Sequence, residues 1–267
     1  MAKKSPKRKY TKRKTKYNPN TYKYVVIFSA VALLFAMASV LRFVYLKKRG
    51  AFDSFSETGY SQIYPVRGVD VSHHNEYINW NMLREENISF VYMKSTEGSD
   101  HLDSEYQTNY PLAKEVGLKV GTYHFYTFGS DGRKQAYHFI ENSNIVSGDL
   151  IPAIDVEHSK INRYTKNKEE YKKIIEELKV MEEVLNEHYG VRPIIYTNKE
   201  CFRLYVKDNF PDNPLWICDL FDVPVDEHSH WDIWQFSHTG NLNSAIGHID
   251  LNFYRGTFDE FKSMLIP

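Results

Sequence analysis

Short apolar runs alternate with segments of helical periodicity over residues 64–267. The clearest helix is predicted over Lys168–Tyr189, where apolar residues recur every three or four positions and Gly190 follows the last turn. Shorter helices are predicted over Tyr77–Glu86, Ser104–Val116 and Gly132–Ile145. Strands are predicted over Val66–Ser72, Phe90–Ser95, Lys119–Phe128, Leu150–His158, Arg192–Tyr196, Leu215–Cys218, Trp231–Phe236 and Ile249–Phe253.

This alternation of strands and helices indicates an α/β fold with a parallel sheet. Little helix separates the last three of the eight predicted strands. We therefore expect an irregular β/α barrel, made of about five βα units followed by short strands.

The amino-terminal segment has a different pattern. Residues 1–23 are rich in lysine and arginine, and Tyr24–Val40 is a run of 17 residues without charge that apolar residues extend to Leu46. This length suits a membrane-spanning helix, and the basic residues before it predict a cytoplasmic amino terminus. We expect a basic tail (1–23), a transmembrane signal anchor (24–46), a linker (47–63) and an extracytoplasmic domain (64–267). The alternative is a signal peptide cleaved near Ala36–Ala38, which would release a secreted protein.

The formal net charge of zero hides a strong asymmetry. Residues 1–50 hold 14 of the 34 Lys/Arg and none of the 34 Asp/Glu, so residues 51–267 carry a formal charge of −14. An acidic body argues against nucleic acid as a partner, because phosphate binding needs a basic surface. The two cysteines, Cys201 and Cys218, do not have the spacing of metal ligands.

Two carboxylates end the predicted strand Leu150–His158. Side chains alternate along a strand, so Asp155 and Glu157 point the same way, with Cα atoms about 6–7 Å apart. Like charges at this distance tend to raise one pKa, and a protonated acid beside an ionised partner suits the cleavage of a glycosidic bond. The alternative is a pair of solvated carboxylates at a strand end.

Polar or aromatic side chains lie near the ends of all eight predicted strands, where β/α barrels carry their chemistry. Solvated loop residues would not be expected to keep this position so regularly, so we favour a functional site. The side chains concerned are Asp70, His73, Lys94, Glu97, Tyr123, His124, Asp155, Glu157, Tyr196, Trp216, Gln235 and Asp250.

Eight short motifs in order resemble the family 25 glycoside hydrolases, the muramidases that include fungal and phage-type lysozymes. The resemblance implies a flattened, irregular, TIM-like β/α barrel with a long groove. It also implies hydrolysis of the β-1,4 bond between N-acetylmuramic acid and N-acetylglucosamine in peptidoglycan. The motifs are Gly68-Val-Asp-Val-Ser72, Lys94-Ser-Thr-Glu-Gly98, Gly121-Thr-Tyr-His-Phe125, Ala153-Ile-Asp-Val-Glu157, Ile194-Ile-Tyr-Thr197, Leu215-Trp-Ile217, Ile233-Trp-Gln235 and Ile249-Asp-Leu-Asn252.

By this resemblance, Glu157 matches the general acid/base, and Asp155 matches the residue that steadies the substrate's N-acetyl group as it attacks the anomeric carbon. Asp70 and Asp250 match the other acidic positions of the site. After Trp216-Ile217 the family usually has a small residue and then an aromatic one, whereas this chain has Cys218-Asp219-Leu220. The residues expected to bind substrate are Tyr123, Tyr196, Trp216, Gln235, His124, Lys94 and Glu97.

Several alternatives remain open at this stage. Lys94 and Glu97 are equally well explained as an ordinary ion pair. His73 and His74 would be metal ligands only with a third group, and we expect them to bond the carboxylates instead, with no metal and no cofactor. We expect a monomer whose partners are peptidoglycan strands and the membrane. Other functions consistent with the sequence are an endoglycosidase on a chitin-like polymer and a silent module that binds cell-wall glycan.

Overall fold

The computed structural model describes residues 19–48, 52, 54–221, 223–224 and 230–267. The chain divides into two compact units, one ending at Tyr45 and the other spanning Leu46–Pro267. Residues 1–18 of the expected basic tail lie outside the described residues. The described part of the first unit belongs to helix α1 (Pro19–Lys48), which starts inside that expected tail.

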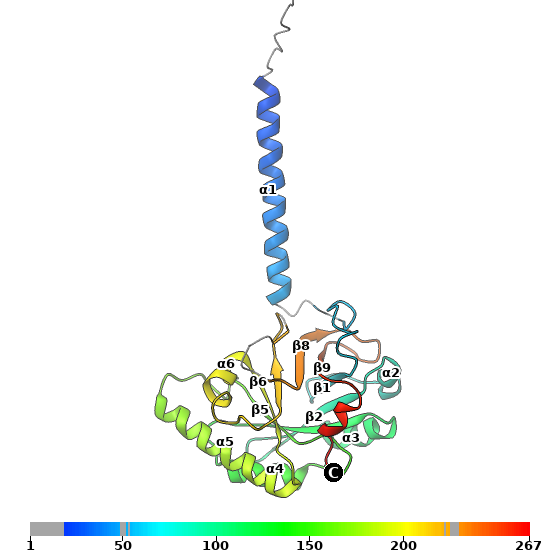
Figure 1. The fold of residues 1–267 in the computed structure, drawn as a ribbon, viewed down its shortest axis with the longest axis vertical. Helices are drawn as coiled ribbons and strands as arrows, with labels where there is room; N and C mark the ends of the chain where they lie inside the picture. Colours follow the sequence, from blue (N-terminus) through cyan, green and yellow to red (C-terminus); the bar gives the residue numbers. More distant parts are fainter. Residues whose placement is uncertain (1–18, 49–51, 53, 222, 225–229) are drawn as a thin grey trace, which may run out of the picture. The chain divides into compact units, whose positions relative to one another are not determined.

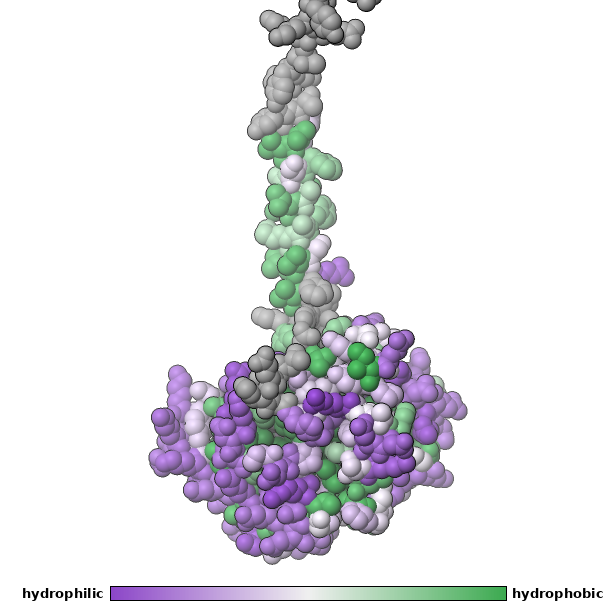
Figure 2. Space-filling view, viewed as in Figure 1, coloured by the Kyte–Doolittle hydropathy of each residue, from purple (hydrophilic) through white to green (hydrophobic). Residues whose placement is uncertain are grey.

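Helix α1 is long and apolar enough to cross a membrane. Its segment Lys23–Arg42 has a mean hydropathy of 2.5, and none of this segment is buried. Its exposed side chains form the hydrophobic surface seen along the helix in Figure 2. A signal sequence near an amino terminus has the same length and composition, so the helix is compatible with both an anchor and a signal peptide.

The second unit is a mixed α/β fold built on a closed barrel of eight strands (Figure 1). The barrel order is β1-β9-β8-β7-β6-β5-β4-β2, and pairing between β1 and β2 closes it, while the short β3 adds to the edge of β2. The strands are β1 (Arg67–Val71), β2 (Phe90–Glu97), β3 (His101–Leu102), β4 (Lys119–Phe125), β5 (Ala153–Val156), β6 (Ile194–Asn198), β7 (Leu215–Cys218), β8 (Ile233–Gly240) and β9 (Ile249–Tyr254).

The expectation of a parallel sheet is wrong for β9, which is antiparallel to both of its neighbours. Strands β1, β2, β4, β5, β6, β7 and β8 pair in parallel around the rest of the barrel. Parallel pairing needs a long crossover, whereas β8 and β9 are joined by a short loop that reverses the chain.

The helices of this unit are α2 (Trp80–Glu85), α3 (Tyr106–Glu115), α4 (Gly132–Asn142), α5 (Lys168–Tyr189) and α6 (Lys199–Cys201), followed by η1 (Phe202–Val206) and η2 (Glu260–Met264). Side-chain caps fix several of their starts. Asn79 accepts from Met82 N before α2, Asp131 accepts from Lys134 N before α4, and Asn167 accepts from Glu169 N before α5.

Helices α4 and α5 lie side by side along the outside of the barrel (Figure 1). They meet at Gly132, where a Cβ would lie 1.8 Å from the carbonyl oxygen of Glu177. The backbone N–H of Gly132 donates to the carboxylate of the same Glu177, over 2.8 Å. A side chain at position 132 would therefore push α4 away from its neighbour.

Inward-pointing side chains fill the barrel, and they form a floor near the carboxyl ends of its parallel strands. Tyr92 of β2 and Tyr196 of β6 pack against Trp216 of β7, with ring centroids 4.8 and 4.7 Å from the indole. At the opposite end, Phe261 of η2 packs on Phe90 at 5.2 Å. The interior is thus a packed core, as in other small barrels.

Residues 54–64 cover the outside of β8 and β9, which no described helix covers. Phe55 is only 4% exposed, and its ring lies 5.4 Å from Phe236 and 5.2 Å from Phe253. Tyr60 packs on Trp234 at 5.5 Å. This part of the expected linker is therefore attached to the barrel through aromatic contacts.

Candidate active site

A cleft of about 720 Å³ lies at the carboxyl ends of the barrel strands. Nine of the eleven site residues expected from the sequence line it: Asp70, Lys94, Glu97, Tyr123, Asp155, Glu157, Tyr196, Trp216 and Asp250. Parallel strands deliver their carboxyl ends to one rim, which explains how residues so far apart in the sequence meet.

Asp155 and Glu157 follow one another on the inward face at the end of β5. Asp155 is 7% exposed, and within the described chain its Oδ1 atom is buried without a hydrogen-bond partner. Burial, and then the charge of Glu157, raise the pKa of Asp155 well above its usual range. Burial also raises the pKa of Glu157, which favours the protonated form that a general acid needs.

Asp70 and Asp250 face each other across the β1–β9 pairing. The Gln235 side-chain amide donates to both, at 2.8 Å to Asp70 Oδ2 and 3.3 Å to Asp250 Oδ2. Asn252 donates a second bond to Asp70 Oδ2, over 2.7 Å. Burial and the nearby charge of Asp250 raise the pKa of Asp70 well above its usual range, so Asp70 holds its proton more tightly than a free carboxylate.

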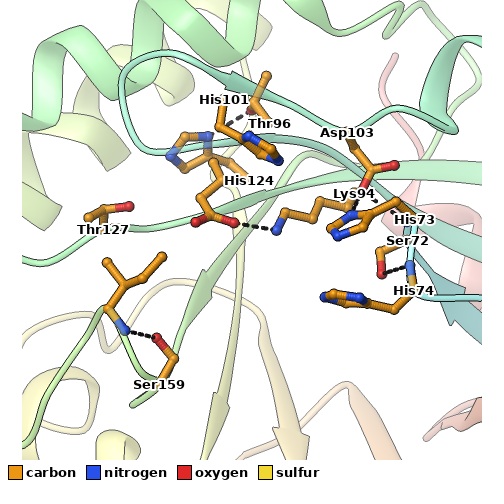
Figure 3. A network of polar contacts seen from close by, with 12 residues as sticks. Ser72, His73, His74, Lys94, Thr96, His101, Asp103, His124, Thr127 and Ser159 are labelled. Carbon is orange, nitrogen blue, oxygen red and sulfur yellow. Dashed lines mark hydrogen bonds and ion pairs between the residues drawn. The ribbon is translucent and has the colours of Figure 1, made fainter.

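Lys94 is a buried cation at the wall of the cleft. Its Nζ atom lies 2.5 Å from Glu97 Oε2, an ion pair drawn as the dashed line from Lys94 in Figure 3. The same atom lies 5.0 Å from the centre of the Phe125 ring. Its charge opposes the rise in the pKa of Asp155 and of Glu157. Lys94 and Glu97 thus form an ion pair, and both side chains also line the cleft.

Four aromatic side chains line the cleft: the expected Tyr123, Tyr196 and Trp216, and also Phe125. Hydrogen bonds fix two of them from below. The Tyr196 hydroxyl donates to Gln235 Oε1 over 2.7 Å, and Trp216 Nε1 donates to Asn252 Oδ1 over 2.8 Å. These two rings, the aromatic platform of the cleft, and the acidic pair Asp70–Asp250 are therefore held by the same two amide side chains, those of Gln235 and Asn252.

Two expected substrate-binding residues do not line the cleft. His124 is fully buried on the outward face of β4, where its ring nitrogens pair with Thr96 Oγ1 at 2.7 Å and Gln135 Oε1 at 3.2 Å (Figure 3). Gln235 is 1% exposed and lies beneath the cleft floor, bonded to the residues that line it.

The histidines after β1 also differ from expectation. His73 does not bond the cleft carboxylates: its Nδ1 atom lies 2.7 Å from Asp103 Oδ2 (Figure 3). His74 lines the cleft instead. No group of three metal-binding side chains suited to an ion is found in the described part of the chain.

The sequence analysis missed His238, which lines the cleft at the end of β8. Its Nδ1 atom lies 3.4 Å from Asp250 Oδ2, and its Nε2 atom lies 3.5 Å from Cys218 Sγ. Partial burial lowers the pKa of His238, but its bonds to Asp250 and Cys218 outweigh this and raise the pKa to about 11. Register shifts on both sides of Ser237 turn this residue toward the cleft, and simple alternation from Gln235 does not predict them.

Comparison with known proteins places the chain among enzymes. Residues 69–245 match the family described as Glycosyl hydrolases family 25. A family 25 glycosyl hydrolase from Bacillus anthracis is 36% identical, with a TM-score of 0.70 over 75% of this chain and 93% of that one. A bacterial lysozyme from Streptomyces coelicolor is 25% identical, with a TM-score of 0.68 over 75% and 96% of the two chains.

A curated relative agrees with these structures. Lysozyme M1 of Streptomyces globisporus is 27% identical over 206 residues, which cover 72% of this chain and 68% of the relative. The family match spans more than half of the chain and includes the cleft residues from Asp70 to His238. This chain therefore belongs to family 25 of the glycosyl hydrolases and is a glycoside hydrolase of the lysozyme, or muramidase, type.

Proposed function

We propose that the chain hydrolyses the β-1,4 bond between N-acetylmuramic acid and N-acetylglucosamine in peptidoglycan, with Glu157 as general acid and base. The observation that carries this proposal is the pair Asp155 and Glu157, both with raised pKa values, at the centre of a cleft lined by aromatic rings. Peptidoglycan is the polymer that lysozyme-type enzymes of this family are expected to meet.

In the first step, Glu157 gives its proton to the leaving glycosidic oxygen as the bond to the anomeric carbon breaks. The acetamido oxygen of the same sugar attacks that carbon, so the substrate supplies the nucleophile. The unpartnered Oδ1 of Asp155 is free to accept the acetamido N–H, whose acidity rises as its oxygen forms the new bond. Ionised Glu157 then takes a proton from water, which attacks the anomeric carbon and opens the ring intermediate.

Asp70 and Asp250 act around this pair. Their shared donor Gln235 also holds Tyr196, so the two carboxylates fix the aromatic platform relative to Asp155. Lys94 offsets the negative charge that accumulates when Glu157 loses its proton. We also propose that the barrel is an irregular TIM-like one with about five βα units. The position of the cleft at the carboxyl ends of the parallel strands supports this likeness.

Helix α1 supports the proposal that the chain is anchored in a membrane with its amino terminus cytoplasmic and its catalytic domain, residues 64–267, extracytoplasmic. The length and hydropathy of Lys23–Arg42 support a span, and the basic residues before it support the orientation. An intact 31.4 kDa chain in the membrane fraction is the expected result. A chain that is shortened near Ala38 and found in the medium would instead indicate a cleaved signal peptide and a secreted protein.

Digestion of purified peptidoglycan and of chitin by the full-length chain tests the reaction. New reducing ends of muramic acid are expected from peptidoglycan, whereas new ends of N-acetylglucosamine alone would refute the proposal in favour of a chitin-like specificity. Glu157→Gln should lower kcat by about 10²–10⁴-fold. Glu183→Gln on the exposed face of α5 is the matched control, expected to keep full activity. Near-normal turnover by the Glu157 variant would refute the assigned role.

A further inference from the structure

His238 stands between two side chains that come from neighbouring strands. Asp250 of β9 lies 3.4 Å from its Nδ1 atom, and Cys218 of β7 lies 3.5 Å from its Nε2 atom. A neutral imidazole has one N–H donor, whereas an imidazolium donates from both nitrogens. The carboxylate of Asp250 accepts only, so Nδ1 donates to it, and the negative charge of this carboxylate favours the charged form of the ring.

The other charged groups near His238 are acids. Asp250 faces it directly, and Glu157 after β5 and Asp70 of β1 both have pKa values that the charge of His238 lowers. The remaining neighbour, Cys218, has a thiol whose pKa is raised by burial, and the bond to His238 opposes this rise only in part. The ring therefore faces three carboxylates and no opposing cation among these partners.

Lys94, which is a buried cation of the cleft, already forms an ion pair with a different carboxylate. Lys94 lies 2.5 Å from Glu97, so one carboxylate neutralises it directly. Asp250 shares Gln235 with Asp70, and its remaining contact is to His238. The charge of Asp250 is thus balanced by His238 and not by Lys94.

We propose that His238 is a positioning residue for the reaction proposed above: its imidazolium pairs with Asp250 and holds that side chain in place, and its charge sets the pH range in which Glu157 acts as an acid. The proposal rests on the proposed function. It adds a residue that reaches the cleft only because β8 is irregular around Ser237.

The sign of the pH effect follows from the charges. A positive ring near Glu157 favours the carboxylate and lowers its pKa. Removing the positive charge raises the pKa of Glu157, so the alkaline limb of the kcat/KM profile moves to higher pH. His238 is 43% exposed, and solvent screening limits the shift to about half to one pH unit.

Three variants of the full-length chain test this inference through kcat/KM on peptidoglycan between pH 4 and 9. His238→Gln removes the charge and the contact to Asp250, and it should move the alkaline limb of the profile upward by about half to one unit, with a several-fold loss of kcat/KM. His238→Lys restores a cation and should return the profile toward the wild type. His230→Gln removes an exposed histidine that pairs with Asp232 at 3.3 Å, outside the cleft, and should leave the profile unchanged.

An unshifted profile for His238→Gln, or an equal shift for the His230 control, would overturn the inference. Titration of the His238 ring by NMR in the wild-type chain, assigned with a His238 variant, gives a second readout that needs no turnover. A ring that stays charged above pH 8 supports the inference, and one that titrates near the ordinary value of about 6.5 refutes it. Because this titration requires no substrate, its outcome is separate from that of the Glu157 and product tests.

Discussion

Replacing Gln235 by methionine removes the amide that joins Tyr196 to both acids of the Asp70–Asp250 pair. In the wild type, Gln235 accepts from the Tyr196 hydroxyl and donates to Asp70 and Asp250. Methionine is close to glutamine in length and volume, so the change deletes hydrogen bonds without opening a large cavity. The perturbation is therefore almost purely polar.

The loss of stability can be estimated bond by bond. The buried Tyr196 hydroxyl loses its acceptor, which costs about 1–3 kcal/mol. Asp70 loses one donor but keeps Asn252, so its contribution is about 1–2 kcal/mol. We expect a total near 2–4 kcal/mol, which for a domain of this size lowers Tm by roughly 5–15 °C. Because the Tyr196 ring and Asp250 also lose their common anchor, kcat should fall roughly ten- to a hundred-fold.

Thermal unfolding and turnover of the full-length chain check these values. Gln135→Met is the matched control, because Gln135 is equally buried and bonds His124 and Thr127, which do not line the cleft. It should lose similar stability and keep kcat per folded molecule. If Gln235→Met unfolds within about 1 kcal/mol of the wild type and keeps full kcat, the shared-anchor explanation is wrong.

Further variants test charge and packing. The pKa of Asp155 is raised in the folded chain, so the fold favours the protonated side chain. This contribution to the free energy of unfolding is complete below about pH 4 and is lost as the pH rises through the folded-state pKa. Asp155→Asn should therefore have a Tm advantage that grows from pH 4 to 8, with activity lost; an advantage that shrinks would contradict the raised pKa. Phe55→Ala should lower the free energy of unfolding by denaturant by about 3–5 kcal/mol, because the buried ring packs on Phe253. A loss below about 1 kcal/mol would show that residues 54–64 pack only loosely on the barrel. Gly121→Ala places a Cβ 2.3 Å from the Tyr92 ring and should cost about 1–3 kcal/mol by the same measurement, and an unchanged midpoint would refute the close packing.

The elements with local signals were predicted well. The helix expected over Lys168–Tyr189 has those bounds in the structure, because its apolar period, its cap at Asn167 and the left-handed Gly190 act within a few residues. The positions of the strands followed from short apolar runs bounded by turns. The direction of β9 depends on its distant partner β1, which a local pattern does not contain.

Most residues that line the cleft could be predicted from the strand ends, but the direction of individual side chains could not. Tyr123 and His124 are adjacent on β4, so only one of them can face the cleft, and alternation alone already separates them. Gln235 faces inward but lies below the surface that substrate reaches. His238 escaped prediction because an irregular register reverses the expected alternation.

Pairing between the first and the last barrel strand has a consequence for biosynthesis. The hydrogen bond from Asn252 to Asp70 joins residues 182 positions apart, and the barrel closes only when β9 pairs with β1. Contacts of such sequence separation form late, because the entropy of closing the loop must be met first. A nascent or truncated chain that lacks β9 holds Asp155 and Glu157 but neither Asp250 nor a closed cleft. Pairing of β9 with β1 thus completes the barrel and the cleft in one step, so a chain without β9 lacks the full site.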